Sequence, residues 1–285
     1  MTPAPLDPNI AEIEDNILTY YKGFTLALGG SFNETDSLVW FTTGRAYFPR
    51  FNGVLRTMLP PGQDLASLVD PVLEYFLTNH LPFFWANSPP GGAAGLEEHL
   101  RAKGVVSATY SLEAMGCSLS NLPANMLPPE IEINEVGRPD ADAGSPGHAQ
   151  DQAAWLDILM EGFQEPEQTR PDFGDYLRRS SAEPQLLFHN FLARWQGVPA
   201  ATGSLLLAPQ AAGLYHVTTL PTYRGRGLGK AITLAVMQAA RQMGYDRMVL
   251  LATPDGYPLY QRLGYAAVAS VDLFVFMGSA PMQGG

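Results

Sequence analysis

Two arginines and three glycines lie close together in the last third of the chain, in the order Arg224, Gly225, Arg226, Gly227 and Gly229. A guanidinium group donates paired hydrogen bonds that match phosphate oxygens better than a lysine ammonium does. Glycines carry no side chain, so a bulky anion can approach the backbone N–H groups closely. These residue types at this spacing predict a binding site for a phosphate-bearing ligand.

The glycines lie between an expected strand and an expected helix. Residues 213–219 are rich in β-branched and aromatic side chains, which favour a strand, and Pro221 ends that run. From 227 to 243 the apolar residues recur at helical spacing. The glycines therefore lie at a helix N-terminus, where unpaired N–H groups and the helix dipole attract anions. A plain helix cap with two solvated arginines is the alternative interpretation.

Two common phosphate-binding motifs do not fit this stretch. A Walker loop needs a glycine where Arg224 stands and a Ser or Thr where Ala231 follows Lys230. A dinucleotide-binding turn needs G-x-G-x-x-G, whereas the three glycines read G-x-G-x-G. Neither nucleotide-binding motif is therefore expected here.

The pattern Arg-x-x-Gly-x-Gly, filled by Arg224, Gly227 and Gly229, resembles the pyrophosphate-binding turn of the GNAT superfamily of N-acetyltransferases. A second segment, residues 259–265 with the sequence Leu-Tyr-Gln-Arg-Leu-Gly-Tyr, is similar to the family's Leu-Tyr-x-x-x-Gly-Phe motif. It follows an apolar strand at 248–252, as that family's order requires. The resemblance covers about residues 131–276.

The resemblance implies an acyltransferase enzyme that moves an acetyl group from acetyl-coenzyme A (acetyl-CoA) to a primary amine by direct attack in a ternary complex. It implies Tyr260 as the general acid for the departing thiolate and a backbone N–H near Thr219 as the donor to the developing oxyanion. Thr253 stands where many members carry an Asn that contacts the coenzyme. The implied coenzyme contacts are Val217, Thr218, Thr219, Arg224, Gly225, Arg226, Gly227, Leu228, Gly229, Lys230 and Thr253.

The general base is not identified by the sequence. His216 is a candidate because an imidazole side chain in general titrates near neutral pH and this one lies just before the coenzyme strand. Strand alternation places Tyr215 and Thr219 on one face and His216 on the other, unless a bulge shifts the register. A structural histidine is therefore the preferred interpretation, and a water relay or an amine that arrives neutral are alternatives. The other histidines, outside this strand and turn, are His80, His99, His148 and His189.

Residues 151–163 and 172–179 read as helices, and residues 185–207 as a hairpin that turns at 196–197. In the resembled family such a helical pair and its loop form a wall of the acceptor site. That implies acceptor contacts from Phe163, Gln164, Glu165 and Glu167. A solvated acidic loop accounts for these residues equally well.

The N-terminal half repeats the order strand, turn, helix, strand. Residues 9–28 and 64–77 read as helices, and 36–43, 53–59 and 82–86 as strands. The stretch Pro60–Asp64, where the phosphate turn would be, has one glycine and no arginine, so this copy is expected to have lost coenzyme binding. An unrelated N-terminal domain is the alternative.

The fold class expected is therefore α/β (α+β), with two GNAT-like domains, each a mixed, largely antiparallel central sheet flanked by helices. The degenerate copy would span 1–130 and the copy with the acetyl-CoA site 131–285, with the boundary near Pro128–Pro129. A strand is expected at 131–136 and, from its composition, a mobile loop at 137–148.

The amino-acid composition limits the classes of binding partner that are expected. The 285 residues carry 17 basic and 28 acidic side chains, a formal net charge of −11, which disfavours nucleic acid and anionic membranes. It mildly favours a small-molecule or peptide amine, although solubility alone also explains it. The lone cysteine, Cys117, gives neither an internal disulfide nor a metal cluster. With no apparent signal sequence or membrane-spanning run, a cytoplasmic protein is expected, and a homodimer stays open.

Three functional hypotheses follow from the sequence. The leading one is the N-acetyltransferase. The second is a non-catalytic acyl-CoA-binding or sensing module, and the third is a structural or partner-binding protein that shares only the fold. The identity of the amine acceptor and the length of the acyl group are not specified by these residues.

Overall fold

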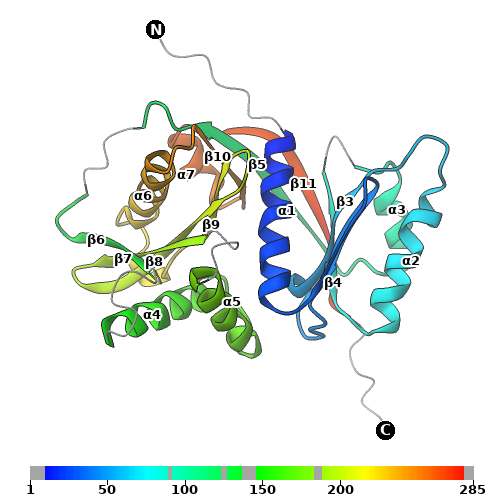
Figure 1. Ribbon diagram of the computed structural model, residues 1–285, viewed down its shortest axis with the longest axis horizontal. Helices are drawn as coiled ribbons and strands as arrows, with labels where there is room; N and C mark the ends of the chain where they lie inside the picture. Colours follow the sequence, from blue (N-terminus) through cyan, green and yellow to red (C-terminus); the bar gives the residue numbers. More distant parts are fainter. Residues whose placement is uncertain (1–9, 89–91, 123–126, 137–145, 183–187, 279–285) are drawn as a thin grey trace. The chain divides into compact units, whose positions relative to one another are not determined.

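A computed structural model describes residues 10–88, 92–122, 127–136, 146–182 and 188–278 (Figure 1). The helices are α1 Ile10–Ala27, α2 Leu65–Thr78, α3 Leu96–Ala102, α4 Pro146–Gly162, α5 Arg170–Ala182, α6 Leu228–Gln242 and α7 Tyr257–Arg262, with short 3-10 turns η1 Pro49–Phe51, η2 Glu167–Thr169 and η4 Pro221–Tyr223. The strands are β1 Ser31–Glu34, β2 Leu38–Thr42, β3 Asn52–Thr57, β4 Phe83–Asn87, β5 Ala108–Ser118, β6 Ile131–Val136, β7 Phe188–Trp195, β8 Val198–Leu207, β9 Ala212–Thr219, β10 Arg247–Ala252 and β11 Ala266–Phe276.

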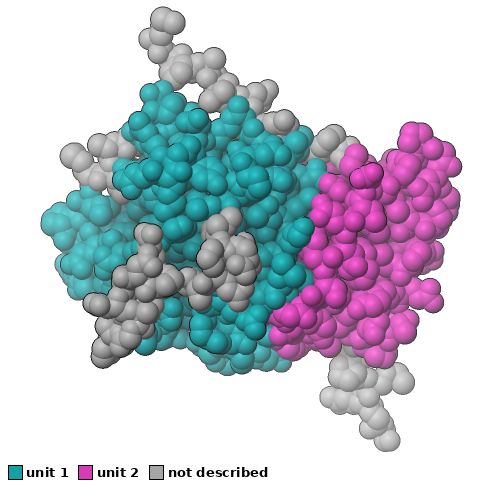
Figure 2. Space-filling view, viewed as in Figure 1, with its two compact units in different colours: residues 1–27, 114–268 teal, residues 28–113, 269–285 magenta. Residues whose placement is uncertain are grey.

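The chain forms two compact units, coloured separately in Figure 2. Unit 1 comprises Met1–Ala27 and Ala114–Val268, and unit 2 comprises Leu28–Glu113 and Ala269–Gly285. These limits differ from 1–130 and 131–285 because α1 packs within unit 1, while β5 and β11 each carry the chain from one unit into the other. Whether 1–130 and 131–285 are two copies of one ancestral domain stays a prediction.

Unit 1 is a mixed sheet with helices on both faces. Its strand order is β10-β9-β8-β7-β6, with the C-terminal part of β5 beside β10. The pairs β6–β7, β7–β8 and β8–β9 are antiparallel, and β9–β10 is parallel. Figure 1 shows α6 and α7 on one side of these strands and α4 and α5 on the other. The main core lies under α6, where Ile232, Val236 and Met237 pack on the strands.

The hairpin β7–β8 turns where the sequence predicts. Gln196 and Gly197, the two residues between the strands, have φ of 50° and 80°. Two consecutive positive φ values are the signature of the tight turn whose twist matches that of the flanking strands. This hairpin brings β8 alongside β9, the strand that leads to the glycine-rich turn.

Unit 2 has the strand order β1-β2-β3-β4, followed by the C-terminal part of β11, which pairs antiparallel with β4. The parallel pair β3–β4 is joined only at Gly53↔Phe84 and Val54↔Trp85 among the described residues. Trp85 is fully buried, and its indole Nε1 donates to Thr57 Oγ1 over 2.9 Å. The interior between these strands and helices α2 and α3 is therefore filled by side chains.

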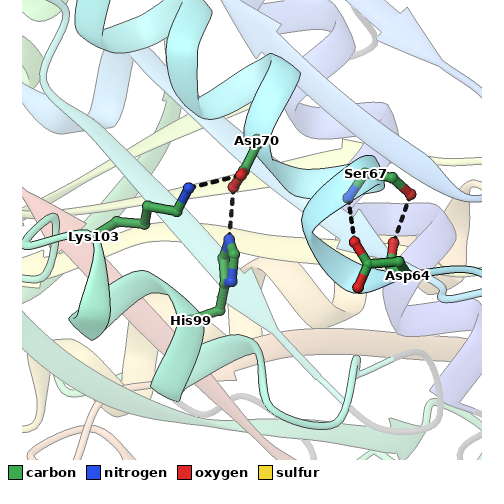
Figure 3. A network of polar contacts seen from close by, with 5 residues as sticks. All are labelled: Asp64, Ser67, Asp70, His99 and Lys103. Carbon is green, nitrogen blue, oxygen red and sulfur yellow. Dashed lines mark hydrogen bonds and ion pairs between the residues drawn. The ribbon is translucent and has the colours of Figure 1, made fainter.

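Helix α2 of unit 2 is capped by its own sequence. The Asp64 carboxylate accepts from the Ser67 N–H at 3.1 Å, and Ser67 Oγ donates to the Asp64 carbonyl (Figure 3). Further along, Asp70 accepts from Lys103 at 2.7 Å and lies 2.6 Å from His99 Nε2, which ties α2 to α3. Lys103 first, and then His99, lowers the pKa of the Asp70 carboxyl.

Most elements expected from sequence are present, with shifted ends, whereas β1, α3, β5 and β11 are additional. Of the loop expected at 137–148, residues 137–145 lie outside the described residues and 146–148 begin α4. Within the described ranges, every helix is too short or too polar to cross a membrane.

Candidate functional site

Strands β9 and β10 pair only at their N-terminal ends. Their described ladder consists of Met248↔Ala212 and Val249↔Gly213, although β9 continues to Thr219 and β10 to Ala252. From Leu214 onward the edge of β9 that faces β10 is therefore open. The Leu220 N–H bonds Ala200 on the opposite side, so by alternation Val217 and Thr219 direct their backbone groups to the open edge. An extended ligand could pair with the chain there.

A β-bulge lies in β9 at His216. Thr218 pairs with Thr202 and Tyr215 with Ser204, so His216 and Val217 together oppose the single residue Gly203. His216 has φ of 52°, in the left-handed region. The simple alternation expected from sequence is therefore wrong at this point.

The bulge changes which side chains share a face of β9. His216 now lies on the same side as Tyr215, where both rings contact Tyr20 of α1. Thr218 follows on that side, while Val217 packs on the core under α6 and Thr219 lies near Gly229. Tyr215 and Thr219 are thus on opposite faces, because the extra residue at the bulge shifts the register by one.

The turn between β9 and α6 exposes a run of unpaired backbone donors. Gly225 and Gly227 have φ of 77° and 84°, values that other residues rarely adopt, and Gly227 forms the N-cap of α6 without a side-chain hydrogen bond. The first N–H of this region that is bonded to a carbonyl is that of Ala231, to Gly227. From Gly225 to Lys230, no N–H finds a partner among the described residues. Such a helix start fits a pyrophosphate.

The three cationic side chains of the turn, Arg224, Arg226 and Lys230, have different contacts. Arg224 Nε donates to the Thr219 carbonyl at 3.2 Å, which turns this guanidinium back towards the end of β9. The guanidinium carbon of Arg226 lies 5.2 Å from the Trp195 ring centre and 5.3 Å from that of Tyr223. Lys230 is exposed in the first turn of α6. All three add positive charge at the same helix start, and the Leu228 side chain anchors it in the core.

Helix α7 brings Tyr260 to the same region. A Cβ placed on Gly229 would lie 3.5 Å from Leu259 Cδ2 and 3.8 Å from Thr219 Oγ1, so β9, α6 and α7 meet at this glycine. The Tyr260 ring packs on Gly256, where a Cβ would come within 2.9 Å of it. Tyr260 is only 9% exposed, and burial raises its pKa to about 12. Its phenol is therefore neutral and able to donate a proton at any physiological pH.

Thr253, in place of the family's Asn, caps its own turn. Its Oγ1 accepts from the Gly256 N–H at 3.3 Å, and its carbonyl accepts from Gly256 and Tyr257. Its side chain is exposed, and the hydroxyl hydrogen is donated to no described residue. The hydroxyl thus retains a donor on the surface of the site, while its oxygen stabilises the start of α7.

The expected acceptor loop lies against β9. A Cβ on Gly162, the last residue of α4, would fall 2.1 Å from Thr218 Oγ1, so the α4 backbone touches this strand directly. Beyond it, Phe163 is about one-third exposed and Glu165 is buried. Glu167 bonds Arg170 instead of extending from the loop. Of the four predicted acceptor residues, Phe163, Gln164 and Glu165 follow this contact directly in the chain.

Three of the histidines, His99, His189 and His216, have structural partners. His189 Nδ1 lies 2.6 Å from Glu135 Oε1 across β6 and β7, and His99 is bound to Asp70 in unit 2. His216 contacts Tyr20 and Ser204, and the side chain of His148 lies outside the described residues. Among the described residues there is no cluster of three or more His, Cys, Asp or Glu side chains suited to a metal ion.

Comparison with known proteins agrees with this geometry. Residues 153–265 match the model of the "Acetyltransferase (GNAT) family". A solved "GCN5-related N-acetyltransferase from Kribbella flavida" superposes with a TM-score of 0.67 at 16% identity, over 93% of this chain and 96% of that one. The chain has the GNAT fold.

Curated proteins that resemble this chain align with only part of it. A mycothiol acetyltransferase of Pseudarthrobacter chlorophenolicus is 29% identical over 160 residues, which are 49% of this chain and 47% of the relative. A glucosamine 6-phosphate N-acetyltransferase of Trypanosoma brucei brucei is 28% identical over 103 residues, 34% of this chain and 67% of the relative. The chain thus spans about half the length of the first of these relatives.

Sequence reasoning missed the part of the site that comes from α1. Asn16 Nδ2 donates to the Ala211 carbonyl, and Tyr20 Oη lies 3.0 Å from His216 Nε2. These contacts join residues 195 and 196 positions apart in the chain. The amphipathic pattern of 9–28 predicts a helix with a buried face but does not specify the strand that it covers.

Proposed function

We propose that this chain is an N-acetyltransferase that moves the acetyl group of acetyl-CoA to a primary amine by direct attack in a ternary complex. The observation that carries the proposal is the open edge of β9, which runs directly into six unpaired N–H groups from Gly225 to Lys230. An extended pantetheine arm with a pyrophosphate at one end matches both features. The GNAT match over 153–265 supports the same assignment.

The proposed coenzyme contacts divide between backbone and side chains. The N–H groups from Gly225 to Lys230 hold the pyrophosphate, and Arg226 and Lys230 add charge. The open-edge groups of Val217 and Thr219 bind the pantetheine arm and the thioester carbonyl. When the amine nitrogen bonds to the carbonyl carbon, a backbone N–H of this edge stabilises the negative charge that develops on the oxygen.

Tyr260 then supplies the proton as the carbon–sulfur bond breaks and the sulfur leaves with the electron pair. A pKa of about 12 disfavours complete transfer to a thiolate of ordinary basicity, near 8.5. Desolvation in the cleft raises the basicity of the thiolate as well, which brings the two groups closer to balance. Tyr260 therefore stabilises the leaving sulfur first by a hydrogen bond and then by proton transfer. The amine gives its own proton to solvent, and solvent returns a proton to the Tyr260 phenolate.

We propose a small polar amine as the acceptor. The relatives named above are acetyltransferases for mycothiol and for glucosamine 6-phosphate, both polar small molecules. The acceptor would approach β9 from the α4 side, where Gly162 touches Thr218 and Phe163 and Glu165 follow. A carboxylate in that loop and a net charge of −11 favour a cationic amine.

We also propose that unit 2 belongs to a degenerate N-terminal copy of the same domain. In both units a parallel strand pair is joined at two positions and then followed by a helix start. In unit 2 the Asp64 carboxylate occupies the N–H of that helix start, and Trp85 bonds Thr57 in the interior between the strands. The phosphate of a second coenzyme molecule would be repelled by the Asp64 carboxylate at that helix start.

We propose the cytoplasm as the compartment, because a chain with a single cysteine forms no internal disulfide and suits a reducing environment.

The test is amine-dependent release of free thiol from acetyl-CoA, with glucosamine 6-phosphate and simple polyamines as first acceptors. The proposal expects saturable release with at least one amine and a product heavier by one acetyl group. It expects the Tyr260→Phe variant to bind the coenzyme normally and to release thiol more slowly. If the chain binds acetyl-CoA but releases no thiol with any amine of a broad panel, the result would instead identify a binding module.

A further inference from the structure

His216 occupies a backbone conformation that its side chain does not favour. Its φ of 52° is in the left-handed region, which is costly for a residue with a Cβ. Such a conformation persists only where the surrounding structure determines it, and it is often found beside a functional site. Here it forms the bulge that directly precedes Val217 and Thr219, the open-edge residues of β9.

Three buried groups hold His216 in this conformation. Tyr20 Oη lies 3.0 Å from Nε2, Ser204 Oγ lies 3.1 Å from Nδ1, and Thr202 Oγ1 donates to the His216 carbonyl at 2.7 Å. Each of these residues is at least nine-tenths buried. The bulge is thus fixed from β8 by two hydroxyls and from α1 by one.

The direction of these bonds follows from the neighbouring groups. Ser204 donates its hydrogen to Asn190 Oδ1 at 2.7 Å, so its oxygen accepts from His216. The Nδ1 atom therefore carries the proton, and Nε2 accepts from the Tyr20 hydroxyl. Both ring nitrogens are engaged in the interior, which leaves His216 without a lone pair to act as a general base towards a substrate.

The Tyr20 ring is placed independently of its hydroxyl. It stacks on Tyr215 with 4.5 Å between ring centres and meets Phe188 edge-on at 5.7 Å. Removing the oxygen would leave this packing in place and break the bond to His216. The same helix is joined to β9 by a second bond, from Tyr215 Oη to Asn16 Oδ1 at 2.7 Å, which does not involve the bulge. Tyr215 therefore offers a matched control.

We propose that Tyr20, in the N-terminal helix, is a positioning residue for acetyl transfer. Through His216 it fixes the bulge that aims the Val217 and Thr219 N–H groups at the thioester. This inference rests on the proposed acetyltransferase function. Helix α1 would then contribute to the geometry of the site, although nearly 200 residues separate it from β9 in the chain.

The experiment compares Tyr20→Phe with Tyr215→Phe in the full chain, by kcat, the KM for acetyl-CoA and thermal unfolding. Misplacing reacting groups slightly is costly, so we expect Tyr20→Phe to lower kcat by about 10- to 100-fold. We expect Tyr215→Phe to leave kcat within about twofold at a comparable loss of melting temperature, because a lost hydrogen bond has a similar effect on stability at either site. Equal kcat losses in the two variants, or no loss in Tyr20→Phe, would overturn the proposal.

A rescue separates positioning from chemistry. Glycine adopts positive φ freely, so His216→Gly should retain the bulge without the side-chain hydrogen bonds to Tyr20 and Ser204. We expect Tyr20→Phe to have little further effect in that background, a coupling that a double-mutant cycle measures. Full additivity of the two changes would contradict the proposal, as would complete loss of turnover in a folded His216→Gly variant.

A spectroscopic readout does not depend on turnover. Nitrogen NMR of His216 should show the Nδ1-protonated tautomer in both chains, because Ser204 accepts from Nδ1 in each, and an Nε2 chemical shift that changes in Tyr20→Phe, where Nε2 loses its donor. If no amine is acetylated but this change is seen, the acetyltransferase proposal fails, whereas the Tyr20–His216 hydrogen bond is confirmed. An unchanged Nε2 chemical shift in Tyr20→Phe would contradict the Tyr20–His216 hydrogen bond itself.

Discussion

Replacing Gly229 by alanine should separate coenzyme binding from folding. An added Cβ at this position would make ordinary contacts, 3.5 Å from Leu259 Cδ2 and 3.8 Å from Thr219 Oγ1, so the fold has room for it. Gly229 is the second residue of α6, where alanine is favoured over glycine by about 0.5–1 kcal/mol. We therefore expect a stability that is unchanged or slightly higher.

Binding should respond in the opposite direction. The new methyl group would occupy space at the helix start where the pyrophosphate is proposed to bind, 3.8 Å from Thr219 Oγ1. Losing one hydrogen bond to a charged group is worth about 1.5–3 kcal/mol. At about 1.4 kcal/mol per factor of ten, the dissociation constant for acetyl-CoA should rise roughly 10- to 150-fold.

Calorimetric titration with acetyl-CoA, together with denaturant unfolding, measures both effects. The matched control is Gly174→Ala within α5, where an added Cβ would meet Leu156 Cδ2 at an ordinary 3.6 Å. It should leave the affinity unchanged. If Gly229→Ala binds acetyl-CoA as tightly as the parent chain, the turn is not the pyrophosphate site and the reasoning from its unpaired N–H groups is refuted.

Three further changes test other parts of the account. Tyr260→Phe should lower kcat by about 10²- to 10⁴-fold, the range for a lost general acid, with the acetyl-CoA dissociation constant unchanged by titration. Burial raises the folded pKa of Tyr260 from 10.0 to about 12, so its contribution of about 3 kcal/mol is present below pH 10 and is lost as the pH rises towards 12. Unfolding measured from pH 9 to 11.5 should therefore be less alkali-sensitive in the Tyr260→Phe variant. Trp195→Leu should remove one of the two rings that hold the Arg226 guanidinium and weaken acetyl-CoA binding by up to about tenfold. Binding of acetyl-pantetheine, which lacks the nucleotide phosphates, should not weaken; equal weakening of both would contradict the electrostatic role. Trp85→Phe should destabilise unit 2 by about 1–3 kcal/mol in denaturant unfolding, because Thr57 loses its partner, while titration still gives one acetyl-CoA per chain.

Local sequence signals predicted the parts of the site that are close together in the chain. The run 213–219 followed by three glycines and a helical repeat predicted β9, the turn and α6, because strand propensity, glycine conformation and helical periodicity are all local properties. The turn at Gln196 and Gly197 was predictable for the same reason. Helix ends shifted by a few residues, since a helix terminus depends on packing as well as on propensity.

The bulge at His216 could not be predicted, since it depends on tertiary contacts. Nothing in the residues around His216 excludes regular alternation. The residues that hold it in the bulge lie on other elements: Thr202 and Ser204 on β8, and Tyr20 on α1. The placement of α1 in unit 1 is a long-range effect of the same kind. Its periodicity indicates a buried face, whereas its partner strand is set by packing across almost 200 residues.

The most direct test of the central claim is thermal unfolding of the full chain with and without excess acetyl-CoA, using NADH and ATP as controls. At about 100 times its dissociation constant a specific ligand adds about 2.7 kcal/mol to stability. The account predicts a higher melting temperature with acetyl-CoA but not with NADH or ATP, and a smaller shift in Gly229→Ala. No shift with acetyl-CoA, or equal shifts with all three ligands, would contradict the assignment of β9 and its glycine-rich turn as an acetyl-CoA site.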